Sequence, residues 1–383
     1  MYRTEAESWA LFGGRLDPAA LPAWADRELI DHIQQALDAL GPFLSAGHRN
    51  SVRFGLGAGT GLRSHAAPLG DREFLCLLPV GLVVRVDYMI RLLERHAAAD
   101  NVHVVDPDFY GDLPEEMKRE RNARPLPYPL DVIGGNAIAG KDFWNALERM
   151  DHEDAALGRS CYRGIQIDQI RQAIMFCCLH EAAHALRNHH RIVKTSADPG
   201  GARRGAELDA EARAGLWIAG LRLTELQQMV PPAERVAALA DSAWRITYAI
   251  ATVLGLFDLD RLAIGDFSED SYHHPAARLA LVVDGMFRGF ASTLGPEIVR
   301  RFLVESSAIA GRAYTSRASR LWMSLCPGGK CRRLTSIYFP VGDRLADLYA
   351  RTVEEYDRFL TEYAVILESS VEGGEAASVE SAT

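Results

Sequence analysis

The feature that most constrains this chain is a stretch rich in apolar residues and histidine from Ile165 to His190, IQIDQIRQAIMFCCLHEAAHALRNHH. Its apolar residues recur every three or four positions, which predicts an amphipathic helix whose buried face is marked by Ile167, Ile170, Ile174 and Cys177. At about 100° per residue, Glu181 falls about 20° from Ile170, and His184 falls about 40° from it on the other side. Two polar side chains therefore continue the buried face.

A buried histidine or glutamate must be hydrogen-bonded, ion-paired or metal-bound to offset the loss of water. His180, Glu181 and His184 spell HExxH, and two histidines four residues apart on one helical face can reach one zinc ion at about 2.0 to 2.1 Å. Glu181 then lies beside the metal, where its carboxylate can take a proton from water. This pattern predicts a zinc site, and the alternative is a core helix that carries two histidines by chance.

A second helix is predicted from AELDAEARAGLWIAGLRLTEL, residues 206–226, with an apolar stripe that includes Ala214, Ile218 and Leu221. Counting back along the helix places Glu207 and Glu211 on the same stripe. Two histidines leave a catalytic zinc one protein ligand short, and we expect Glu207 to supply it. Glu211 is then expected to orient a histidine through its free ring nitrogen. Alternatively, both are first-turn acids favoured by the helix dipole.

A third acid of this helix, Asp209, lies about 200° from Glu207 and therefore on the opposite face. Arg213 follows it at the i+4 position and is its natural ion-pair partner. We expect Asp209 to stay outside the buried face.

Another histidine is an alternative candidate for the third metal ligand. His190 comes ten residues after His180, as in the metzincin pattern HExxHxxGxxH, but Arg187 occupies the glycine position of that pattern. Without glycine the backbone cannot readily make the required turn. We therefore expect His189 and His190 to be exposed at the helix end, where the dipole favours them.

These motifs resemble the gluzincin zinc metallopeptidases, in which HExxH and a downstream ExxxD form the metal shell. Here HEAAHALRNHH is followed by ELDAE, with Glu211 at the family's aspartate position, and about 110 of the 383 residues carry the resemblance. SYHHPAAR, residues 271–278, is similar to the histidine-proline element of prenyl-protein-processing and Oma-type gluzincins, although Arg278 comes sooner here. The short ligand spacing looks more like the phage-exclusion Lit-type or repressor-cleaving ImmA-type peptidases.

The resemblance implies a zinc metalloendopeptidase that hydrolyses a protein or peptide substrate. Zinc held by the two motif histidines and Glu207 would activate water, and Glu181 would pass the water proton to the leaving amine. The oxyanion then needs a further donor, for which His274 or Tyr272 is the candidate. Alternatively, the HHP sequence starts a helix with Pro275 at its first position. The different class of function that remains open is a non-catalytic helical interaction or regulatory protein with a structural or degenerate metal site.

Composition indicates which partners and which cellular compartment to expect. The chain has 51 acidic and 42 basic residues, a formal charge of −9, which gives no support to nucleic-acid binding. Its most apolar long stretch, residues 236–257, is interrupted by Asp241, Ser242 and Arg245, which favours a core helix over a membrane span. Six cysteines in a chain of this length make no disulfide framework, and the opening residues do not look like a signal peptide. We therefore expect a cytoplasmic protein.

The expected fold is mainly α (α+β), a zincin-like helical core with a small β-containing N-terminal region. We predict an accessory region of unknown role at 1–150, a helical zinc-peptidase domain at 151–368 and a disordered acidic tail at 369–383. Further helices are expected at 26–40, 88–98, 143–150, 231–257, 275–293, 296–314 and 341–369. Strands are expected within 73–87 and at 102–105, with a flexible glycine-rich loop at 54–70, an irregular segment at 107–129 and a linker at 191–205.

Overall fold

The computed structural model describes residues 3–17, 19, 27–45, 48–59, 61–97, 163–263, 273–325 and 343–368. These residues form a mainly helical α+β fold with one small sheet, as expected. The N-terminal part contains α1 (Glu5–Ala10), α2 (Arg27–Ser45), β1 (Ser51–Gly57), β2 (His65–Pro68), β3 (Glu73–Pro79) and α3 (Val80–Ala97). The rest contains α8 (Arg163–Leu186), α9 (His189–Thr195), α10 (Pro199–Met229), η4 (Pro232–Glu234), α11 (Arg235–Ala263), α12 (Pro275–Leu294), α13 (Pro296–Leu325) and α15 (Asp343–Glu368).

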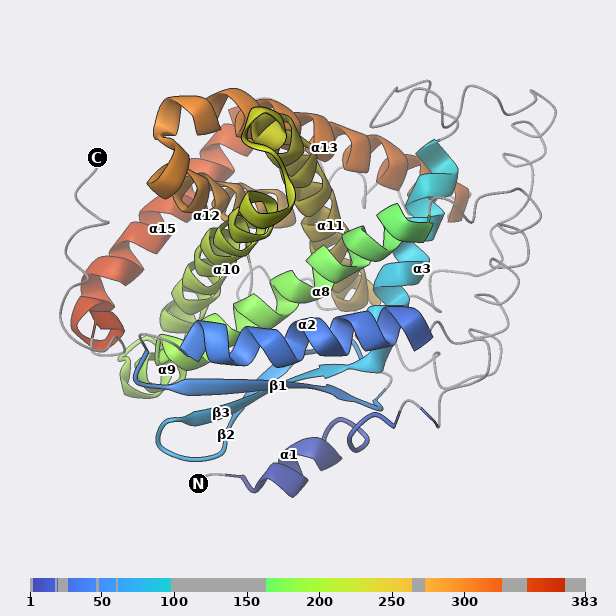
Figure 1. Cartoon of the computed structure of the whole chain (residues 1–383). Helices are drawn as coiled ribbons and strands as arrows, with labels where there is room; N and C mark the ends of the chain where they lie inside the picture. Colours follow the sequence, from blue (N-terminus) through green and yellow to red (C-terminus); the bar gives the residue numbers. More distant parts are fainter. Residues whose placement is uncertain are drawn as a thin grey trace.

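Helix α8 crosses the middle of the molecule and carries the HExxH motif. It lies between α2 and the sheet on one side and α10 and α11 on the other (Figure 1). Its side chains are buried on several faces, so the single apolar stripe expected from the sequence understates how enclosed the helix is. One hydrophobic core joins residues of α2, the sheet and α3 to residues of α8, α10 and α11.

The sheet has the strand order β1-β3-β2, with β1 parallel and β2 antiparallel to β3. Alternate residues of β3 face opposite ways: Cys76 belongs to the core shared with α2 and α8, whereas Leu75 and Leu77 pack with residues near α1. Strand β2 is an edge strand of this sheet. Its position beside α8 brings it close to the HExxH motif.

The prediction of a flexible loop at 54–70 was wrong, because most of β1 and all of β2 lie there. The glycines of this segment make room for the N-terminal residues. A Cβ on Gly55 would lie 2.2 Å from the Trp9 ring, and one on Gly57 would lie 2.5 Å from the Cβ of Phe12. Glycine is therefore required here by close packing across a strand.

Three predicted boundaries were also wrong. Strand β3 ends at Pro79 and α3 starts at Val80, so the helix begins eight residues before the expected start at 88. Short apolar runs do not distinguish a buried strand from a buried helix. Helix α2 continues through Pro42 to Ser45 instead of ending at 40. Helix α13 runs to Leu325, past the expected end at 314.

The prediction that the motif helix continues to His190 was wrong. The helix ends at Leu186, and Asn188 adopts the left-handed conformation with φ of 58° before α9 begins. Asn50, just before β1, stabilises this break because its Nδ2 donates to the Ala185 carbonyl oxygen at 2.8 Å and to Asn188 Oδ1 at 3.0 Å. The break turns the chain so that His189 faces a different direction from a continued α8.

The predicted linker at 191–205 is mostly helical instead. It contains most of α9 and the start of α10. Asp198 caps α10, accepting a hydrogen bond from the Gly201 amide at 3.0 Å, and Pro199 occupies the first turn. Proline at this position starts a helix without losing a needed hydrogen bond, which explains why a Pro-Gly segment is helical here.

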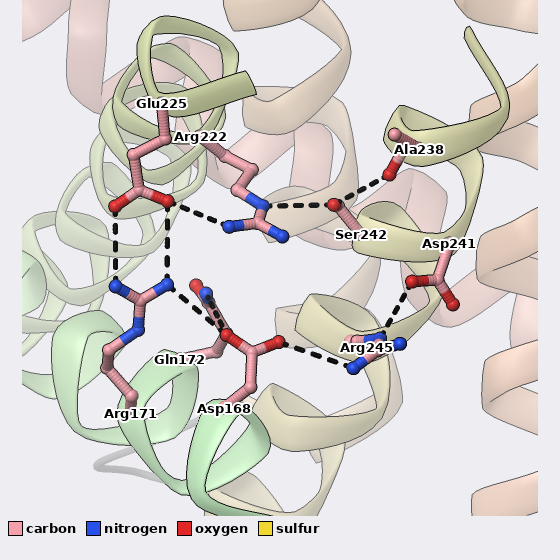
Figure 2. Close-up of polar contacts among 9 residues, drawn as sticks. All are labelled: Asp168, Arg171, Gln172, Arg222, Glu225, Ala238, Asp241, Ser242 and Arg245. Atoms are coloured by element: carbon pink, nitrogen blue, oxygen red, sulfur yellow. Dashed lines mark hydrogen bonds and ion pairs between the residues drawn. The ribbon is translucent and has the colours of Figure 1, made fainter. Parts of the chain in front are cut away.

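A polar network holds α8, α10 and α11 together through residues at the start of α8 (Figure 2). Arg171 contacts Glu225 on α10 at 3.4 Å through two nitrogens and Asp168 on its own helix at 3.2 Å. Arg222 contacts the same glutamate at 2.8 Å, and Arg245 on α11 lies 3.8 Å from Asp168. These partly exposed contacts link the three helices.

Two glycines allow α10 and α12 to pack backbone to backbone. A Cβ on Gly285 would lie 2.1 Å from the Ala212 carbonyl oxygen, and one on Gly215 would lie 2.2 Å from that of Val282. We expect Gly285→Ala to lower the free energy of unfolding by about 1 to 3 kcal/mol, because the helices must move apart. Gly220→Ala is the control, since nothing lies within 4 Å of its Cβ, and it should be neutral or stabilising by up to about 1 kcal/mol. Urea denaturation of both variants measures this; equal stabilities would contradict the packing described.

The predicted helices at 275–293 and 341–369 are confirmed as α12 and α15 within two residues, and the helix at 231–257 is confirmed as α11, which starts four residues later and ends six residues later. The predictions for 102–105, 107–129, 143–150 and the tail at 369–383 lie outside the described residues. No helix in the described ranges is long and apolar enough to cross a membrane.

Candidate metal centre

The structure brings His180, His184 and Glu207 together where α8 faces α10. The Nε2 atoms of the two histidines are 3.1 Å apart, and Glu207 Oε2 lies 3.2 Å from His180 Nε2. Glu207 Oε1 is 3.6 Å from His184 Nε2. The convergence of one ligand atom from each residue was predicted from helical spacing, and all three lie within 4.8 Å of one another.

This donor set fits a divalent metal. Two ring nitrogens bound to one tetrahedral zinc at about 2.05 Å lie about 3.4 Å apart, close to the separation seen here. Without a cation, two imidazole nitrogens at this distance repel each other unless one of them carries a proton. The side chains of His180, His184 and Glu207 are 12, 21 and 15% exposed, respectively. The site is therefore sheltered but open to solvent on one side. Two imidazoles and a carboxylate are ligands typical of catalytic zinc.

Electrostatics in the metal-free protein agree with a cation-binding role. Burial alone lowers the pKa of His184, but the carboxylate of Glu207 outweighs burial and raises it to about 9. Burial alone raises the pKa of Glu207, and the two histidines outweigh it and hold the pKa well below its usual range. The site therefore keeps an anionic oxygen and attracts positive charge, which a bound metal ion can supply.

His189, predicted to be exposed, is buried and contacts the site. Its Nδ1 lies 2.9 Å from His184 Nδ1, and its Nε2 lies 2.9 Å from Asp209 Oδ2. The prediction failed because it assumed a continuous helix, whereas the break at Asn188 turns His189 inward. His190 is exposed, as expected.

The hydrogen bonds around His189 determine where the protons lie. Asp209 only accepts, so His189 Nε2 must donate to it. Burial lowers the pKa of His189 to about 4, so the ring is neutral near pH 7 and its Nδ1 accepts. His184 must then donate from Nδ1, so a metal ion that displaces the proton on its Nε2 would meet the lone pair of that nitrogen.

Asp209 is also buried, contrary to the prediction that it stays outside. Arg187 donates to it at 2.6 and 3.3 Å, and Tyr356 of α15 donates at 3.2 Å. Arg213, the expected partner, lies farther away at 3.8 Å. The side of α10 that carries Asp209 is covered by Arg187 and by α15, which a pattern of apolar spacing within one helix does not reveal.

Glu211 is fully buried one turn after Glu207, as predicted. Arg278 of α12 donates to its Oε1. Burial raises the pKa of Glu211, although Arg278 and His180 oppose this effect. Within the described part of the chain, Glu211 Oε2 and His180 Nδ1 are buried and have no hydrogen-bond partner. The predicted hydrogen bond from Glu211 to a histidine is therefore not formed in this structure.

Glu181 lies beside the candidate metal ligands and is held from the sheet side. The Ser64 hydroxyl, just before β2, donates to Glu181 Oε1 at 2.7 Å. Sequence reasoning missed Ser64, because the contact joins residues 117 apart in a segment interpreted as a loop. The hydroxyl leaves the other carboxylate oxygen available to a water molecule.

A cleft of about 530 Å³ opens over these residues. Its floor is α8 with the two ligand histidines and Glu181, and one wall is β2 with His65 and Ala66. Glu207 belongs to the opposite wall, on α10. The site thus combines a metal-binding set, a carboxylate and an edge strand in one cleft.

The structure describes one of the two predicted oxyanion donors. Tyr272 lies outside the described residues. His274 precedes α12 as its N-cap, where its Nδ1 accepts from the Ala276 amide at 3.1 Å and Pro275 begins the helix. The helix-start interpretation of HHP is therefore confirmed. Among the described residues of α12, Arg278 in the first turn is the one that lines the cleft.

Comparison of the chain with models of known protein families, with curated proteins and with solved structures finds no match.

Proposed function

We propose that this protein is a zinc-dependent metallopeptidase that hydrolyses peptide bonds in a protein substrate. The observation that carries the proposal is the convergence of His180, His184 and Glu207 with Glu181 beside them at the floor of an open cleft. The resemblance of the HExxH and ExxxE motifs to gluzincins supports the same reaction class. A purely structural metal site does not need a carboxylate base beside it.

The residues of the chain take distinct roles in this reaction. His180, His184 and Glu207 would hold the metal, with His184 oriented by His189. When bound, zinc would supply a Lewis acid for the scissile carbonyl and for the attacking water. Glu181 accepts the proton of that water and donates it to the leaving amine. Ser64 keeps the Glu181 carboxylate turned toward the cleft.

Strand β2 supports a peptide as the substrate. It is the edge strand of the described sheet and lines the cleft next to Glu181. An extended peptide can add to such an edge through backbone hydrogen bonds, which bind any sequence in a fixed orientation. This would place a backbone carbonyl over α8.

The experiment is metal removal and restoration. Chelator-treated protein should leave a set of denatured proteins intact, whereas protein given one equivalent of zinc should produce new peptide N-termini, detected by mass spectrometry. A second chelation should stop cleavage. If zinc-loaded protein produces no new termini, the proposal fails and a non-catalytic interaction or regulatory role is favoured.

A further inference from the structure

We infer that the cleft selects peptides with an acidic side chain next to the scissile bond, held between Arg63 and Arg203. This inference rests on the proposed peptidase function and adds the substrate class. Arg63 lies two residues before β2 and Arg203 lies on α10, and both line the cleft that contains the candidate metal centre. Both side chains are exposed at the cleft.

The charge balance of the cleft favours an anionic ligand. Its lining contains the arginines Arg63, Arg203 and Arg278 and the carboxylates of Glu181 and Glu207. Arg278 is neutralised by Glu211 below the surface, and a divalent ion would neutralise the two carboxylates. The remaining charge is that of two arginines, in a chain whose formal charge is −9. A positive cleft in an acidic protein attracts anionic substrates.

Neither arginine has an ionic partner among the described residues, although acids are near. Arg204, the neighbour of Arg203, is held by Glu355 of α15 at 2.9 Å. Arg203 stands four residues before Glu207, a spacing that favours an ion pair. The Glu207 carboxylate instead faces the two histidines. Arg203 is therefore left free to bind a ligand.

The position of Arg63 links this charge to the reaction centre. Arg63 precedes Ser64, whose hydroxyl contacts the Glu181 carboxylate at 2.7 Å. A peptide lying along β2 advances about 3.3 Å per residue, so side chains within one or two residues of the scissile bond can reach Arg63. Guanidinium groups bind carboxylates through two parallel hydrogen bonds, which makes an aspartate or glutamate side chain the matching ligand.

The test uses peptides capped at both ends, so that only side chains carry charge. Pairs with glutamate or glutamine at each position around a common cleavage site are compared by kcat/KM. Wild-type protein should prefer glutamate by about tenfold or more at one position, because hydrogen bonds to charged groups are strong. Arg63→Gln and Arg203→Gln should each reduce that ratio, and Arg203→Glu should favour lysine there. Added salt should weaken the preference.

Arg191→Gln is the matched control, because Arg191 is exposed on α9 near the cleft but does not line it. It removes the same charge and should keep the glutamate preference. Equal cleavage of glutamate and glutamine peptides by the wild type would overturn the charge inference and leave the peptidase proposal standing. Cleavage of neither peptide set, in zinc-loaded protein, would overturn both.

Discussion

Glu181→Gln is expected to lower the rate of peptide cleavage by about 10² to 10⁴, the usual contribution of a positioned general acid and base. Glutamine has nearly the same shape and can still accept the Ser64 hydrogen bond through its carbonyl oxygen, but it cannot take the water proton. The candidate metal ligands are His180, His184 and Glu207, so the variant should bind zinc as the wild type does. Cleavage rates and zinc content of the same preparation measure both effects.

Ser64→Ala separates orientation from proton transfer. It removes the hydroxyl that contacts Glu181 Oε1 but keeps the carboxylate, so its loss of rate should be smaller than that of Glu181→Gln.

A Glu181→Gln protein that cleaves at the wild-type rate would show that Glu181 is not the base. A variant that loses zinc together with activity would instead place Glu181 among the metal ligands.

Asp209→Ala is expected to lower the free energy of unfolding by about 3 to 5 kcal/mol, because it leaves Arg187 buried without its charge partner. Arg187 is only 7% exposed, and Asp209 is fully buried. The control is Asp284→Asn, which breaks the i,i+4 pair with Arg288 on the surface of α12 and should cost less than about 1 kcal/mol. Urea denaturation in chelator compares the folds without metal.

The pH dependence of the Asp209 effect has a definite sign. Burial alone would raise the pKa of Asp209, but Arg187 and His189 outweigh burial and hold it well below its usual range. A depressed pKa means that the stabilisation is complete above the unfolded value of about 3.9 and is lost as the pH falls below it. The difference between wild type and Asp209→Ala should therefore be constant from about pH 5 to 8 and shrink in stronger acid.

Asp209→Ala should also weaken zinc binding, by about 10- to 100-fold, because it frees His189 and so the ring of His184. A stability loss below 1 kcal/mol with unchanged zinc affinity would contradict the role given to this buried network.

The convergence of the candidate metal ligands could be predicted from sequence because helical periodicity is a local property. In α8 and α10 the spacing alone places His180, His184 and Glu207 toward a common interior, and the structure brings these side chains together. The same reasoning predicted the buried position of Glu211. This convergence depends only on each segment being helical over the few residues that carry its motif.

The residues that support the ligands could not be predicted in this way. His189 turns inward because one residue, Asn188, leaves the helical conformation and is held by Asn50 from the far side of the core. Asp209 is buried because α15, about 150 residues later, covers its face through Tyr356. Ser64, the residue before strand β2, reaches Glu181 from a glycine-rich stretch. Each depends on tertiary packing, which a single helix or strand pattern does not contain.

Zinc titration of chelator-treated protein tests the central claim most directly. Wild-type protein should bind one zinc ion per chain, and Glu207→Gln and His180→Ala should each weaken that binding by more than about a hundredfold, a larger loss than removing a supporting residue causes. His190→Ala, which changes an exposed histidine of the same cleft, should bind zinc as the wild type does. Absence of zinc binding by the wild type, or binding that is unchanged in Glu207→Gln, would contradict the account.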